Sequence, residues 1–140
     1  MDYRPRSFVL QELVAPTIYD RLGEDAWDLF NENALRALQA LRDRFGPIVV
    51  NDWHRGGTFR ESGLREMNTT TGAVKSAHKR GEAFDCKPTQ MLSREMNDYI
   101  VTHPDEFRLI RRVENKQYTP SWMHFDVVTH DGKGIKVFNP

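Results

Sequence analysis

The sequence has little of several features that define particular classes of protein. A single cysteine, Cys86, among 140 residues excludes an internal disulfide framework and a zinc site built from several cysteines. No apolar run approaches the roughly 20 residues of a membrane span, so we expect no membrane partner. The 20 basic and 20 acidic residues cancel and form no long block of one sign, which argues against nucleic acid as a partner.

The chain also lacks repeats, low-complexity tracts and a change of composition that would mark a linker. The first ten residues do not follow the basic, apolar, small order of a secretory signal, so we expect synthesis in the cytoplasm without a signal peptide. With 39% apolar and 29% charged residues, the composition is that of a globular protein. We expect residues 1–140 to fold as a single domain and to act as a monomer.

Apolar spacing predicts three helices. A short helix begins at Pro16 and ends at about Leu22. A longer one has Asn31 or Asn33 as its N-cap and stops at Gly46. A third stops at the His103-Pro104 pair. The apolar stripes that define the second and third helices are Ala34, Leu38, Leu41 and Phe45, then Leu92, Met96, Tyr99 and Ile100.

Runs of β-branched and aromatic residues predict strands, most of them late in the chain. A glycine-containing turn at residues 131–134 predicts a hairpin between the last two strands. The stretch 54–75, rich in Gly, Ser, Thr and Arg, predicts a long loop of functional type. We therefore expect an α+β fold with N-terminal helices packed on a small, mainly antiparallel sheet. The predicted strands are 47–53, 82–86, 107–113, 122–128 and 135–138.

Side chains alternate across a strand, and this rule separates ionisable from apolar residues in two of these strands. His124 and Asp126 fall on one face of strand 122–128 with Trp122 and Val128, and Met123, Phe125 and Val127 fall on the other. In strand 82–86, Asp85 falls opposite to Phe84 and Cys86. Cys86 is thus expected in the core, which disfavours a cysteine nucleophile.

Two histidines and one aspartate are the candidate metal ligands. His78 precedes Asp85 by seven positions, and His124 lies on a later strand. Imidazole nitrogen and carboxylate oxygen suit Zn²⁺, and three protein ligands leave a fourth position for water. Spacing alone also fits ordinary core or surface histidines, which remain the alternative.

The residues around these positions resemble a known family. S-A-H-K-R-G-E-A-F-D, residues 76–85, resembles the S-x-H-x-x-G-x-A-x-D signature of zinc D-alanyl-D-alanine carboxypeptidases and L-alanyl-D-glutamate endopeptidases of the hedgehog/DD-peptidase fold. W-M-H-F-D, residues 122–126, is similar to their second motif, and S-G-L-R, residues 62–65, to their S-G-Y-R. The resemblance covers about residues 47–128, and the N-terminal part resembles small phage-encoded members.

The resemblance implies that His78, Asp85 and His124 hold Zn²⁺. It implies that Arg65 binds a substrate carboxylate or steadies the oxyanion of the tetrahedral intermediate, with Arg55 and Arg60 as rivals. Ser76 would form a hydrogen bond within the site, and Trp122 would line the substrate cleft. The expected function is a zinc metallopeptidase that cleaves an amide bond in peptidoglycan stem peptides, as phage endolysins do, after release from the cell or from a virion.

One position departs from the family pattern. Many members carry Glu or Asp as general base three residues before the second histidine, where this chain has Ser121. Asp126 is then the candidate for proton transfer, or else it orients a ligand, and Glu114 and Glu82 are further candidates. Without a base, the alternative is a catalytically inactive phage structural or cell-wall-binding protein that keeps the metal-binding fold.

Overall fold

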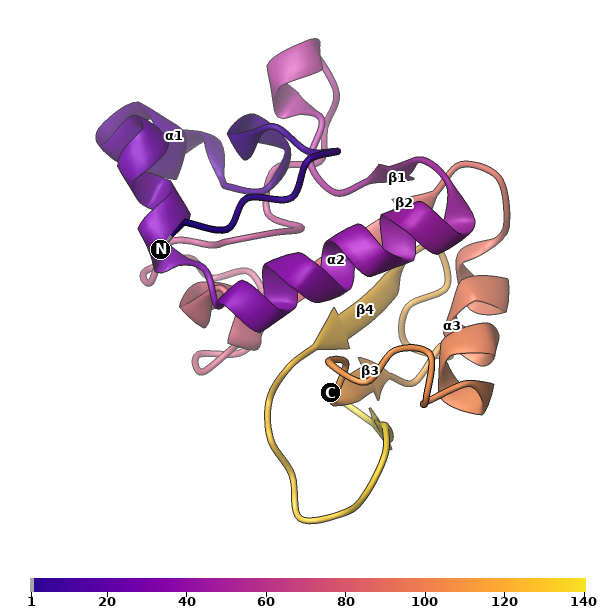
Figure 1. Ribbon diagram of the computed structural model, residues 1–140. Coiled ribbons are helices and arrows are strands. Elements are labelled where there is room, and N and C mark those ends of the chain that lie inside the picture. Colours follow the sequence, from indigo (N-terminus) through magenta and orange to yellow (C-terminus); the bar gives the residue numbers. More distant parts are fainter. Residues whose placement is uncertain (1) are drawn as a thin grey trace.

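The computed structural model describes residues 2–140 and has an α+β fold, with three α-helices and a five-stranded, mostly antiparallel sheet in that part of the chain (Figure 1). No helix described in it is both long enough and apolar enough to cross a membrane. The helices are α1 (Pro16–Leu22), α2 (Glu32–Phe45) and α3 (Ser93–Thr102), and the strands are β1 (Ile48–Val49), β2 (Ala83–Pro88), β3 (Arg112–Glu114), β4 (Met123–Asp126) and β5 (Lys136–Phe138).

The three α-helices lie where the apolar spacing predicts them. The side chain of Asn31 caps α2 by accepting hydrogen bonds from the backbone N–H groups of Asn33 and Ala34. Gly46 ends this helix with a φ of 83°, a backbone conformation that favours glycine. Short 3-10 helices add to these elements: η1 (Leu10–Glu12), η2 (Gly23–Leu29), η3 (Trp53–Arg55) and η4 (Ala77–Arg80).

The sheet has the strand order β1-β2-β4-β3-β5. Its pairs are antiparallel except for β3 and β5, which are parallel. The predicted hairpin between the last two strands is therefore wrong. Both edges of β4 are occupied by β2 and β3, so the chain leaves β4 through a wide loop and its last strand adds to the free edge of β3 (Figure 1).

The predicted strand over 107–113 is also wrong in extent, since only Arg112–Glu114 is extended and paired. The residues before it form turns that place Phe107 and Ile110 in the core. These two side chains are buried because the turns direct them into the core, and not because they alternate along a strand. At the other end of the sheet, β1 is only two residues long.

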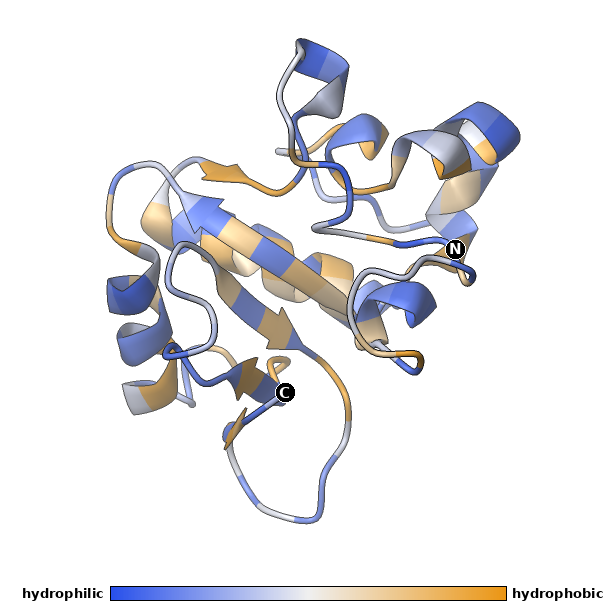
Figure 2. Cartoon of the chain, turned by 180° about the vertical axis from the view of Figure 1, so that it is seen from behind, coloured by the Kyte–Doolittle hydropathy of each residue, from blue (hydrophilic) through white to orange (hydrophobic). Residues whose placement is uncertain are grey.

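The register of β2 and β4 creates two unlike faces. Phe84 pairs with Phe125 and Cys86 with Met123, and all four side chains are fully buried in the main apolar cluster, on the side that α2 crosses. The opposite face is turned to the viewer in Figure 2, where bands of hydrophilic residues alternate with apolar ones along both strands. Burial raises the pKa of the Cys86 thiol, which fits its predicted role as a core residue.

Candidate metal centre

Three side chains from separate elements converge on the polar face of the sheet: His78 from η4, Asp85 from β2 and His124 from β4. One ligand atom of each lies within 4.8 Å of the others. Asp85 Oδ1 is 3.2 Å from His78 Nε2 and 3.0 Å from His124 Nδ1. Two ligands of a tetrahedral zinc ion, each about 2.0–2.1 Å from it, lie about 3.3 Å apart. The spacing thus suits one shared cation.

Local structure explains the residues of the S-x-H-x-x-G pattern. Ser76 Oγ accepts the backbone N–H of His78 at 3.2 Å and so caps the short helix that carries this ligand. Gly81 ends the helix with a φ of 68°, and a Cβ at this position would lie 2.3 Å from the carbonyl oxygen of Leu29. Glycine is therefore required where the chain turns into β2, so that Asp85 lands opposite His124.

The second nitrogen of each imidazole is held by the protein. His78 Nδ1 lies 3.0 Å from the carbonyl oxygen of Gly63, which can only accept, so this nitrogen carries the proton. His124 Nε2 lies 3.0 Å from Asp126 Oδ2 and donates to it. The remaining nitrogens, His78 Nε2 and His124 Nδ1, are those that face Asp85. This pattern of outer hydrogen bonds is typical of metal-ligating histidines.

Asp126 lies behind the His124 imidazole and is fully buried. Its two oxygens receive a fork of hydrogen bonds from Arg112, with Nε at 2.9 Å and Nη2 at 2.8 Å. Burial alone raises the pKa of Asp126, but the hydrogen bonds from His124 and Arg112 outweigh it and lower the pKa. The geometry therefore favours the orienting role of Asp126 over proton transfer at the cation.

The charges of the three ligands depend on one another. Burial lowers the pKa of His78 and so favours neutral imidazole. Burial also opposes ionisation of Asp85, but His78 and His124 outweigh it and hold its pKa well below the ordinary range. Burial lowers the pKa of His124 too, yet hydrogen bonds to Asp126 and Asp85 raise it to about 9. When His124 is protonated, one proton lies between His124 Nδ1 and Asp85. A metal cation can occupy the same position instead of this proton.

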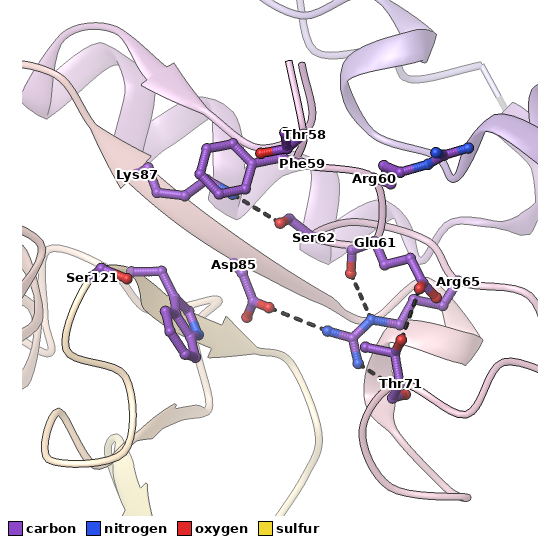
Figure 3. Close-up of a pocket in the computed structure, with 11 residues that line it drawn as sticks. Thr58, Phe59, Arg60, Glu61, Ser62, Arg65, Thr71, Asp85, Lys87 and Ser121 are labelled. Carbon is purple, nitrogen blue, oxygen red and sulfur yellow. Dashed lines mark hydrogen bonds and ion pairs between the residues drawn. The ribbon is translucent and has the colours of Figure 1, made fainter. Parts of the chain in front are cut away.

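Arg65 borders the centre and is 9% exposed. Its Nη2 donates to Asp85 Oδ2 at 3.3 Å, its Nε to the Glu61 carbonyl at 2.6 Å and its Nη1 to the Thr71 carbonyl at 3.5 Å (Figure 3). Arg65 thus binds the Asp85 oxygen that does not face the histidines. Of its two rivals, Arg60 lines a neighbouring cavity and Arg55 lies on η3 among residues that line neither cavity at the centre.

Two cavities meet at the centre. One, of about 410 Å³, is lined by the three candidate ligands together with Glu114 and Trp122. The other, of about 380 Å³, extends along β2 towards Phe59 and Lys87 (Figure 3). Both cavities share Arg65, Thr71, Asp85 and Trp122. Trp122 lines both cavities, and that either is a substrate cleft stays a prediction. Trp53 instead donates its indole N–H to the Val14 carbonyl, outside both.

Glu114, one of the further candidates for the base, lines the ligand cavity. Arg112 pairs with Asp126 and Val113 with Phe125, so the next residue, Glu114, falls beside His124 on the polar face. Its carboxylate is half-buried and has no hydrogen bond or ion pair within residues 2–140. Burial raises the pKa of Glu114 above its ordinary value. Glu82, by contrast, pairs with Arg80 at 2.7 Å and lines neither cavity.

No family model, no curated protein and no solved structure matches the chain in the three comparisons. The resemblance to zinc peptidases accordingly stays a prediction from the sequence motifs.

Proposed function

We propose that the protein is a zinc-dependent peptidase that hydrolyses an amide bond in peptidoglycan stem peptides. The observation that carries this proposal is the convergence of His78, Asp85 and His124, with the outer nitrogen of each imidazole held by a separate acceptor. The signature residues around these ligands support the same substrate class. The protein would work as a monomer, reaching the wall after release from the cell or as part of a virion.

Zinc fits the donor set best. Two imidazole nitrogens and one carboxylate oxygen suit Zn²⁺, and hard cations such as Mg²⁺ and Ca²⁺ prefer sites built from oxygen. Three protein ligands are the usual number in a catalytic zinc site. When bound, zinc supplies an activated water and polarises the carbonyl of the scissile amide.

The protein's own groups supply the rest of the chemistry. Glu114 takes the proton of the attacking water and passes it to the leaving amine, since its half-buried carboxylate is uncommitted and faces the ligand cavity. Asp126 and Arg112 fix the orientation of His124. Arg65 holds Oδ2 of Asp85, which leaves Oδ1 directed at the cation. The carboxylate of Glu114 can replace the general base that the family carries at the position of Ser121. Its presence favours an enzyme over an inactive binding protein.

The test measures zinc content and wall hydrolysis together. We expect the purified protein to bind one equivalent of zinc and to clear a suspension of cell walls, with clearing stopped by a chelator and restored by zinc. Asp85→Asn should lose both zinc and clearing. His103→Ala is the matched control, because His103 is exposed at the end of α3 and outside the centre. A zinc-loaded protein that binds walls but releases no peptide would instead identify the binding protein.

A further inference from the structure

The second cavity contains a cation, Lys87, that forms no close ion pair, and the carboxylates of Asp85 and Asp52 act on its charge only from a greater distance. Lys87 Nζ donates to the Val50 carbonyl at 2.5 Å and to Ser62 Oγ at 2.8 Å, and it lies 4.0 Å from the centre of the Phe59 ring (Figure 3). Within residues 2–140, no carboxylate oxygen lies within 4.0 Å of this ammonium group. All of its close partners are therefore neutral.

The other cations of the two cavities that are at least half-buried are already engaged. Arg65 pairs with Asp85, and Arg112 pairs with Asp126. Glu61, which also lines the second cavity, accepts hydrogen bonds from the hydroxyls of Thr69 and Thr71 at 2.6 and 2.8 Å. An anionic group that enters the second cavity thus finds a half-buried counter-charge without a close ion pair at Lys87, not at Arg65, and Arg60 offers only an exposed one.

The position of Lys87 along β2 sets the distance from the metal centre. Asp85 and Lys87 are alternate residues of one strand, so they share a face and lie about 7 Å apart along it. One residue of an extended peptide spans about 3.6 Å. One such residue and a hydrogen bond of about 2.8 Å nearly cover this distance, so a substrate whose scissile carbonyl lies at the centre can place a carboxylate of the next residue at Lys87.

We propose that Lys87 and Ser62 form a subsite for a carboxylate on the residue adjacent to the cleaved bond, and this inference rests on the proposed peptidase function. The Phe59 ring, 42% exposed, covers the ammonium group and forms the outer wall of the subsite. Carboxylate recognition, which the sequence resemblance assigns to Arg65, is performed by Lys87, because the guanidinium is held by Asp85 and two backbone carbonyls.

The test uses two pairs of peptides with the zinc-loaded protein. The first pair is N-acetyl-D-alanyl-D-alanine and its C-terminal amide. The second is N-acetyl-L-alanyl-D-glutamate with its γ-carboxyl amidated, and with the α-carboxylate either free or amidated. Calorimetry measures the Kd of each peptide, and chromatography follows cleavage in parallel. The pairs distinguish a carboxylate at the chain end from one within a longer stem peptide.

In at least one pair, the free acid should bind about 10- to 100-fold tighter than the amide, the range for loss of one charge-assisted hydrogen bond. Lys87→Gln should remove this preference and leave zinc content unchanged, and Lys87→Arg should restore part of it. Arg60→Gln is the matched control, since this exposed arginine lines the same cavity and points away from Asp85 in Figure 3. It should keep the preference.

Two outcomes would overturn the subsite. In one, the wild-type protein binds acid and amide equally in both pairs, a result that needs no variant to fold. In the other, Lys87→Gln retains zinc and the full preference, and the carboxylate then binds elsewhere, for example at the metal. Failure of the peptidase proposal looks different: the acid binds with a Lys87-dependent preference, but no peptide is cleaved.

Discussion

The two faces of β2 and β4 carry the same number of residues and opposite chemistry. On the α2 side, Phe84, Cys86, Met123 and Phe125 are fully buried and belong to the main apolar cluster. On the other side, Asp85, His124 and Asp126 form a chain of hydrogen bonds that ends at Arg112. The side chains of the apolar face stabilise the protein through their shape and volume, so a substitution there changes the stability of the whole fold. The polar face depends on paired charges, so its residues act on one another and could together hold a cation.

The largest effect is expected on the apolar face. Phe125→Ala removes a fully buried ring that packs on Phe84, and such a change costs about 3–5 kcal/mol, a large share of the stability of a typical domain. Denaturant unfolding of wild type and variant measures the loss. Leu109→Ala, at a side chain that is 38% exposed, is the control and should change stability little. A stable Phe125→Ala protein that fails to bind zinc would show that the two faces are not separate in function.

The next largest effect concerns Glu114, the proposed proton acceptor on the polar face. Glu114→Gln should lower kcat by about 10²- to 10⁴-fold, the range for loss of a general base, while zinc content and stability stay near wild type. Glu82→Gln is the matched control, since its carboxylate pairs with Arg80 outside the cavities. Kinetics on zinc-loaded variants provide the measurement. Equal activity of Glu114→Gln and wild type would require another base.

Strand alternation explains why much of the centre could be predicted from the sequence. The period of two is a local property of the backbone, so the shared face of His124 and Asp126 and the inward direction of Cys86 follow from the sequence alone. Helix caps are local too, and Asn31 and Gly46 fall where the sequence predicts them. Strand pairing brings together Asp85 and His124, η4 adds His78, and the motif resemblance predicts this set of three ligands.

Contacts between distant segments could not be predicted in this way. The partner of β5 depends on which sheet edge is free, and the role of Asp126 depends on Arg112, which reaches it only through the register of β3 and β4. Lys87 was missed because the predicted strand ended at Cys86. In the structure β2 continues to Pro88, which puts Lys87 on the face of Asp85.

A smaller effect should follow from Asp126→Asn, which tests an orienting role against a catalytic one. The variant loses the negative charge and one of the two oxygens that accept hydrogen bonds from His124 and Arg112, and such outer changes weaken zinc binding by about 10- to 100-fold. Chelator competition measures the zinc Kd. Because Asp126 acts through His124, activity should return at saturating zinc. Activity that stays lost in the fully zinc-loaded variant would identify Asp126 as the base.

The metal-free protein should show a dependence of stability on pH that zinc should abolish. In the chelator-treated protein, the pKa of His124 is raised from 6.5 to about 9, so its protonated form binds Asp85 and Asp126 more strongly in the folded state. This contribution is fully present below pH 6.5 and is lost as the pH rises through about 9. With zinc on Nδ1 no such proton is bound, so the slope should vanish. Melting temperatures from pH 6 to about 9.5, with chelator or with zinc, measure both curves.

His103→Ala should keep the slope of the metal-free protein and His124→Gln should lose it, because of these two histidines only His124 lies between two carboxylates. If the melting temperature of the metal-free protein did not change with pH, folding would not raise the pKa of His124.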